Sequence, residues 1–159
     1  MLSNNGFPPT VGMTEKLMFI GEYSLTVDEK GRLSIPVKYR DSLSRGAVVT
    51  RGLDSSLFLY TEKEWKTLAE KLAALPISRA NTRAFSRLML AGAMDVELDR
   101  QGRIILPDYL REFAGIHKKV VVAGLYNRLE IWNEASWLNY KKQTEKGSKD
   151  IAETLDQLI

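Results

Sequence analysis

Two five-residue segments of the chain place an aspartate four positions before an arginine, with a glycine directly before that arginine. These segments are 28–32 and 99–103. An aspartate at the first position and a glycine at the fourth are typical of a type I turn that closes with a left-handed glycine. The arginine that follows such a turn can pair with the aspartate, bind a phosphate bidentately or contact a guanine edge.

The spacing alone leaves two interpretations of these turns open, and they are compatible. In the structural one, aspartate and arginine pair across the base of the turn. In the functional one, the same pairing orients cations toward a nucleic acid. The candidate DNA-binding residues are then Lys30, Arg32, Arg103 and Arg100. The candidate orienting residues are Asp28, Gly31, Asp99 and Gly102.

The two turns belong to a longer internal repeat. Segment 27–36 aligns with 98–107, and segment 48–60 aligns with 120–132. A unit of about 45 residues made of short strands cannot bury its apolar face alone, whereas two related units can share one core. We therefore expect an α+β fold in which two tandem repeats form a pseudo-twofold, interlocked β-barrel of the swapped-hairpin, or double-split, kind with flanking helices.

Composition and periodicity divide the chain into five parts. Residues 1–17 are rich in Asn, Gly and Pro, which predicts a disordered extension, either native or produced by an upstream start-codon assignment. The other parts are a first repeat at 22–65, a helical linker at 66–91, a second repeat at 92–137 and a helical tail at 138–159.

Capping signals predict where the helices begin. Pro36 and Pro107 each occupy the expected first position of a short helix. Thr61 opens a capping box at the start of the linker. Ser78 is expected to cap a second linker helix at about 79–91.

Two further clusters have both a structural and a nucleic-acid interpretation. Three arginines recur every four residues on the linker and form a basic stripe: Arg79, Arg83 and Arg87. Such a stripe is usually a solvated helix face. Two aromatic pairs have the spacing of hydrophobic staples, which favours packing over base stacking: Tyr60 with Trp65, and Trp132 with Trp137.

Composition sets limits on the chemistry. The chain has 159 residues, a formal net charge of +3 and no cysteine, which excludes thiolate metal sites and suits a reducing compartment. The mild basicity permits nucleic-acid binding without establishing it. His117 is the one histidine, and no catalytic triad or phosphate-binding loop can be assembled around it. We expect no enzyme activity, no cofactor, no metal, no membrane span and no small-molecule substrate.

Several segments together resemble the MraZ family. They are 18–23 (MFIGEY), 28–36, 99–103, 124–127 (GLYN) and 129–132 (LEIW). The resemblance extends from about residue 18 to the end of the chain, in both repeats. Each repeat is also similar to the SpoVT-AbrB type of DNA-binding module.

The resemblance implies a function that the spacing does not show. MraZ proteins are transcriptional regulators of the bacterial division and cell-wall gene cluster. They bind tandem promoter repeats in double-stranded DNA as ring-shaped homo-oligomers, in the cytoplasm and in association with the nucleoid. Their contacts with DNA come from the first hairpin, which here carries Lys30 and Arg32, and Arg103 stands in the second copy. Gln101 replaces the lysine in that copy, so the second hairpin either contacts DNA or packs protomers together.

Three other functions remain as alternatives. A structural or interaction ring would tolerate the loss of Arg32 and would show no specific DNA binding. A hydrolase would use Asp28 or Asp99 in a concave pocket. An AbrB-type antitoxin normally carries one module and a toxin-binding tail, so the duplication within this chain argues against it.

Overall fold

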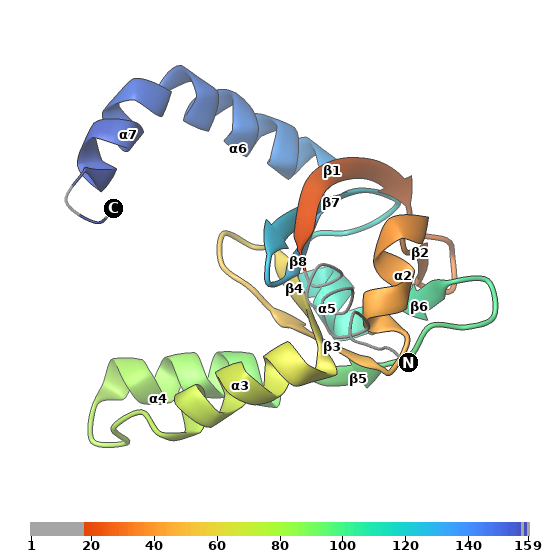
Figure 1. Ribbon diagram of the computed structural model, residues 1–159, viewed down its shortest axis with the longest axis horizontal. Coiled ribbons are helices and arrows are strands. Elements are labelled where there is room, and N and C mark those ends of the chain that lie inside the picture. The colour runs from red at the N-terminus through yellow and green to blue at the C-terminus, as the bar shows by residue number, and fades with distance from the viewer. Residues whose placement is uncertain (1–17, 157, 159) are drawn as a thin grey trace, which may run out of the picture.

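A computed structural model describes residues 18–156 and 158 of the chain. The expected disordered extension at 1–17 lies outside the described residues. Figure 1 shows a β-rich body with two groups of helices that project from opposite sides of it.

In the described part of the chain, eight strands in two antiparallel groups build the body. Six form a sheet in the order β1-β7-β8-β4-β3-β5, and β2 and β6 form a separate ribbon. The strands of the first repeat are β1 (Phe19–Thr26), β2 (Arg32–Ser34), β3 (Ala47–Arg51) and β4 (Leu57–Thr61). Those of the second are β5 (Met94–Val96), β6 (Arg103–Ile105), β7 (Lys119–Tyr126) and β8 (Leu129–Asn133).

The strand pairings interlock the two repeats. Strand β1 of the first repeat pairs with β7 of the second, and β5 of the second pairs with β3 of the first. The equivalent strands β4 and β8 pair with each other, as do β2 and β6. Each repeat therefore completes the sheet of the other about a pseudo-twofold axis. This confirms the expected α+β fold with two exchanged repeats.

Short helices cover the strands, and longer helices extend from them. Helices α2 (Val37–Leu43) and α5 (Asp108–Phe113) are equivalent in the two repeats, as are α3 (Glu62–Ala73) and α6 (Glu134–Lys146). The linker continues through α4 (Ala80–Ser86) into a π-helical segment, η1 (Arg87–Ala91), and the chain ends with α7 (Ser148–Leu155).

One core joins both repeats beneath the ribbon. Leu33 of β2 and Ile104 of β6 face inward and are at most 1% exposed. They belong to the same apolar cluster as Leu57 of β4, Ile131 of β8 and Leu110 of α5. Since neither repeat contains this core alone, the burial that stabilises the ribbon requires both of them.

Capping and stapling follow the sequence signals. Thr61 accepts a hydrogen bond from the backbone N–H of Glu64 at 3.1 Å, and Asn133 accepts one from the N–H of Ser136 at 3.0 Å. The stapled aromatic rings lie 5.9 Å apart, centroid to centroid, for Tyr60 and Trp65, and 5.3 Å apart for Trp132 and Trp137. These rings pack against one another, as the staple spacing predicts.

Three local expectations were wrong. Pro36 and Pro107 are the residues before the first helical position, because their ψ angles of 136° and 148° are extended. Ser78 does not cap α4; Arg79 precedes that helix and makes no side-chain capping bond.

The second half of the linker is π-helical rather than a continuous α-helix. The Thr50 hydroxyl donates to the carbonyl of Met89 at 2.6 Å, and Arg51 donates to the carbonyl of Leu88 at 3.3 Å. Side chains from β3 therefore donate to carbonyls that would accept backbone hydrogen bonds in an α-helix. A side chain inserted into the backbone hydrogen bonds of a helix is a known cause of helix distortion.

Candidate nucleic-acid interface

The first turn is held by one carboxylate that accepts three hydrogen bonds. Asp28 Oδ1 accepts from the backbone N–H groups of Lys30 and Arg32, both at 2.9 Å, and Asp28 Oδ2 accepts from Arg32 Nε at 2.6 Å. The N–H of Gly31 donates to the carbonyl of Asp28 at 3.0 Å. Gly31 has φ +81°, the left-handed conformation that the spacing predicts.

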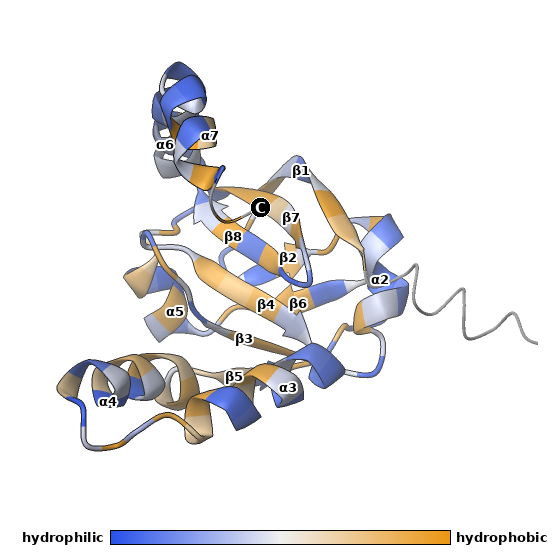
Figure 2. Ribbon diagram, turned by 60° about the vertical axis from the view of Figure 1, so that its left-hand side comes forward, coloured by the Kyte–Doolittle hydropathy of each residue, from blue (hydrophilic) through white to orange (hydrophobic). Residues whose placement is uncertain are grey.

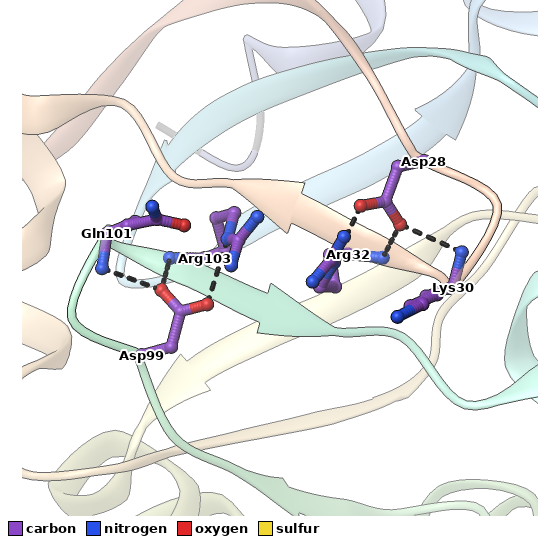
Figure 3. A network of polar contacts seen from close by, with 6 residues as sticks. All are labelled: Asp28, Lys30, Arg32, Asp99, Gln101 and Arg103. Carbon is purple, nitrogen blue, oxygen red and sulfur yellow. Dashed lines mark hydrogen bonds and ion pairs between the residues drawn. The ribbon is translucent and has the colours of Figure 1, made fainter.

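The second turn repeats this geometry. Asp99 Oδ1 accepts from the N–H groups of Gln101 at 2.8 Å and Arg103 at 3.0 Å, and Asp99 Oδ2 accepts from Arg103 Nε at 2.8 Å. Gly102 has φ +77°. Figure 3 shows the two turns at opposite ends of the β2–β6 ribbon, each with its aspartate against its own arginine.

Both aspartates remain ionised at neutral pH. The backbone N–H of Arg32 is the main cause that lowers the pKa of Asp28, and the Arg32 side chain and the N–H of Lys30 add to it. The N–H of Arg103 lowers the pKa of Asp99 in the same way. An ionised carboxylate holds the guanidinium that donates to it in one orientation.

The ribbon brings the two arginines to one face. Arg32 lies opposite Ile105, and Ser34 lies opposite Arg103. Because side chains alternate along a strand, these four residues point outward while their neighbours point into the core. Arg32 and Arg103 are diagonal neighbours in this register, a relation that corresponds to about 7–8 Å between Cα atoms. Their side chains are 31% and 27% exposed.

The four candidate cations do not form one cluster. Arg32 and Arg103 lie on the ribbon, whereas Lys30 and Arg100 are exposed at the two turn tips. Because the strands are antiparallel, the tips are at opposite ends of the ribbon. The outward face is therefore an extended surface with arginines in its middle and a cation at each end.

Each turn is supported by the other repeat, which sequence reasoning missed. The N–H of Leu106 donates to the carbonyl of Gly31 at 2.8 Å, and the N–H of Ile35 donates to the carbonyl of Gly102 at 2.9 Å. A Cβ on Gly31 would meet the Arg111 guanidinium carbon at 2.9 Å. A Cβ on Gly102 would overlap with Arg40 Nε.

Arg40 and Arg111 also fix the start of the short helices. Arg40 Nε donates to the carbonyl of Ile35 at 2.8 Å, and Arg111 Nε donates to the carbonyl of Leu106 at 3.0 Å. A sequence signal was available, because both arginines stand four residues after the aligned prolines Pro36 and Pro107.

Two further cations adjoin the first turn and were also missed. The N–H of Val27, the residue before the turn, donates to the carbonyl of Lys118 at 2.7 Å. Lys118 and Lys119 are exposed. They come from the second repeat, so the exchanged pairing of β1 with β7 places their backbone next to Thr26 and Val27, just before the first turn.

Three observations on the described residues concern metal binding, membrane spans and paired carboxylates. In residues 18–156 and 158, no group of three or more acidic, histidine or cysteine side chains is placed to hold a metal ion. No helix of this part is long and apolar enough to cross a membrane. Asp28 and Asp99 belong to turns at opposite ends of the ribbon, so they do not form a carboxylate pair.

Comparison with known proteins identifies relatives that cover most of the chain. A family model described as "MraZ protein, putative antitoxin-like" matches twice, at residues 18–88 and 89–159. A protein of Natranaerobius thermophilus is 47% identical over 138 residues, which cover 87% of this chain and 96% of the relative. A protein of Desulfitobacterium hafniense is 48% identical over 141 residues, which cover 89% and 99%. Both relatives are named "Transcriptional regulator MraZ". The chain, with its two interlocked repeats, therefore belongs to the MraZ family.

Proposed function

We propose that this protein is a DNA-binding transcriptional regulator whose contact surface is the outward face of the β2–β6 ribbon. The observation that carries the proposal is the pair of aspartate-oriented arginines that the register places on that one face. The names of its relatives support the same function. The likeness to MraZ proteins extends the proposal to the division and cell-wall gene cluster, to binding in the cytoplasm on the nucleoid, and to a ring of identical subunits.

The ribbon has the shape and chemistry that contact with DNA requires. The major groove of B-DNA is about 12 Å wide and admits a two-stranded β-ribbon. Asp28 and Asp99 each accept a hydrogen bond from the Nε–H of their arginine. The terminal Nη groups of each arginine can then donate to a guanine edge or a phosphate. The exposed Lys30 and Lys118 lie beside the first turn, where the DNA backbone would pass.

Four parts of the chain have roles in this proposal. Repeats 22–65 and 92–137 each supply half of the ribbon. The helical parts 66–91 and 138–159 join subunits into a ring. Several subunits then engage successive promoter repeats together, so that weak single contacts add up through high effective concentration. Gln101 in place of a lysine makes the second turn the weaker contact of the two.

The test is a titration of the DNA upstream of the gene that encodes this chain, at two salt concentrations. We expect tight binding by the wild-type protein that weakens steeply with salt, because phosphate contacts release counterions. Arg32→Ala is expected to lose specific binding, since a bidentate base contact contributes about 1–3 kcal/mol of discrimination and every subunit loses it. Sedimentation of the variant should match the wild type.

The matched control is Lys63→Ala, which removes one exposed cation from α3, far from the ribbon in Figure 1. This variant should bind as the wild type does. Wild-type affinity in the Arg32→Ala variant would contradict the assigned surface. No binding by a folded, oligomeric wild-type protein would favour a structural ring without specific DNA binding.

A further inference from the structure

Ile105 is a large apolar side chain on the outward face of the β2–β6 ribbon. It is 59% exposed, although it belongs to a strand. Strand β4 is mostly hydrophobic in Figure 2, and all five of its residues are buried. Core burial therefore accounts for the apolar residues of β4, whereas Ile105 is apolar without being buried. Single exposed apolar residues are common on protein surfaces, so the position of Ile105 decides what it can do.

The register of the ribbon places Ile105 between the two arginines of the candidate DNA surface. Ile105 lies directly opposite Arg32, and it follows Arg103 by two positions on the same strand. Residues directly opposite each other in an antiparallel pair have Cβ atoms about 4.5–5.5 Å apart. The spacing of successive base pairs is about 3.4 Å. If Arg32 contacts a base edge, Ile105 therefore lies within reach of a base pair one or two steps away.

The equivalent position in the first repeat carries a different kind of side chain. Strand β2 has the sequence Arg-Leu-Ser and strand β6 has Arg-Ile-Ile, so Ser34 corresponds to Ile105. Ser34 is exposed and lies opposite Arg103. Its hydroxyl can donate and accept hydrogen bonds, whereas the side chain of Ile105 can do neither. The two halves of the ribbon therefore present different chemistry outward, in spite of their pseudo-twofold relation.

The major groove of DNA offers one apolar group that an aliphatic side chain can contact, the C5-methyl of thymine. The other groups that the base edges present there are hydrogen-bond donors and acceptors. An aliphatic side chain pressed against such a group removes water from it and supplies no hydrogen bond in return, which is unfavourable. At the place that Ile105 occupies on the ribbon, its chemistry therefore favours thymine over the other bases.

We propose that Ile105 is a specificity-determining residue that contacts the methyl group of a thymine, within about two base pairs of the base that Arg32 contacts. This inference rests on the DNA-binding face of the proposed function and adds a base that one part of that face recognises. Because Ser34 presents a hydroxyl at the equivalent position, the two halves of the ribbon recognise different bases. The ribbon consequently has one preferred direction on the DNA.

The test removes one methyl group at a time from the DNA. In the upstream fragment of the titration described above, each thymine is replaced singly by deoxyuridine, which keeps the base pair and lacks only the C5-methyl. For the wild-type protein, we expect at least one replacement to weaken binding about fourfold, which corresponds to the loss of one buried methyl group. Ile105→Ser copies the residue of the first repeat. This variant should bind the unmodified fragment more weakly, and the same replacement should have no further effect on it.

The matched control is Leu53→Ser, because Leu53 is similarly exposed, at 53%, and belongs to the β3–β4 turn, which lies away from β2 and β6 in Figure 1. This variant should respond to deoxyuridine as the wild type does. Both substituted positions are exposed, so circular dichroism should show an unchanged fold.

Three outcomes would overturn the inference, and they are distinguishable. If no replacement changes the affinity of the wild type, the ribbon does not contact a thymine methyl. If every effective replacement weakens Ile105→Ser as much as the wild type, the methyl contact lies elsewhere and Ile105 is a solvated strand residue. If the wild type does not bind even the unmodified fragment, the proposed function fails together with this inference.

Discussion

At the scale of single residues, the carboxylates of Asp28 and Asp99 each close a turn and orient an arginine. Each carboxylate accepts two backbone N–H groups that close its turn and one Nε–H that orients an arginine. The arginines are only about 30% exposed, so their reach is limited and their orientation matters. Loss of either aspartate would therefore have two effects: the guanidinium would no longer be held in one orientation, and the turn would lose stabilising hydrogen bonds.

Stability in acid should therefore depend on these carboxylates. Their pKa values are lower in the folded protein than the ordinary aspartate value of 3.8. Their contribution is then present above that value and is lost as pH falls through the lower, folded pKa. We expect the free energy of unfolding, measured by urea denaturation, to fall less steeply below pH 5 in an Asp28→Asn, Asp99→Asn protein than in the wild type. Equal slopes would show that the carboxylates do not stabilise the turns.

At the scale of elements, the β2–β6 ribbon depends on contacts that each repeat makes with the turn of the other. Arg111 and the carbonyl of Leu106 lie against Gly31, and Arg40 lies against Gly102. Glycine is thus required at both positions for two reasons. Its φ angle is positive, and the other repeat lies too close to leave room for a Cβ. The exchange also explains why β2 makes its ladder with β6, whereas Leu33 of β2 makes an isolated bridge with Val27, the residue that follows β1.

Substitution of Gly31 should separate these two requirements. Gly31→Ala is expected to cost more than the roughly 1–2 kcal/mol of a left-handed alanine, because its Cβ also displaces Arg111. Gly115→Ala is the matched control, since Gly115 has φ +63° and its Cβ would meet nothing within 4 Å. Thermal or urea unfolding should show the larger loss for Gly31→Ala. Equal losses would mean that the arginine moves aside freely.

At the scale of the whole molecule, the interlocked pairing makes the two repeats one folding unit. The longest strand pairing, β1 with β7, joins residues about 100 positions apart in the chain. The central pair β4–β8 and the ribbon also cross between repeats. Such non-local pairing brings basic residues from both repeats to one surface, while α3–α4 and α6–α7 extend from the body at two separate places.

Fragments of the chain should show this dependence directly. A fragment of residues 1–88 lacks β6, β7 and β8, so as a monomer it cannot complete the core. We expect neither this fragment nor residues 89–159 to unfold cooperatively as a monomer. An equimolar mixture of the two should regain the circular dichroism and cooperative urea transition of the intact chain. A monomeric fragment with its own cooperative transition would contradict the shared core.

The sequence by itself determined the repeat, the two turns, the staples and the family. Asp28 and Gly31 specify their turn through bonds within five residues, and Thr61 caps α3 through a bond three residues away. Interactions of this range depend on local spacing, and the repetition of the pattern made them visible twice. The need for a shared core followed from the small size of each repeat.

Only the tertiary structure decided which residues meet across the exchange. The placement of Arg111 against Gly31, of Lys118 beside the first turn and of Arg103 diagonal to Arg32 depends on strand register between distant segments. The π-helical turn at η1 likewise depends on Thr50, 39 residues before the carbonyl that it binds. No local pattern encodes a register between strands, because it is selected by the burial of apolar side chains over the whole core.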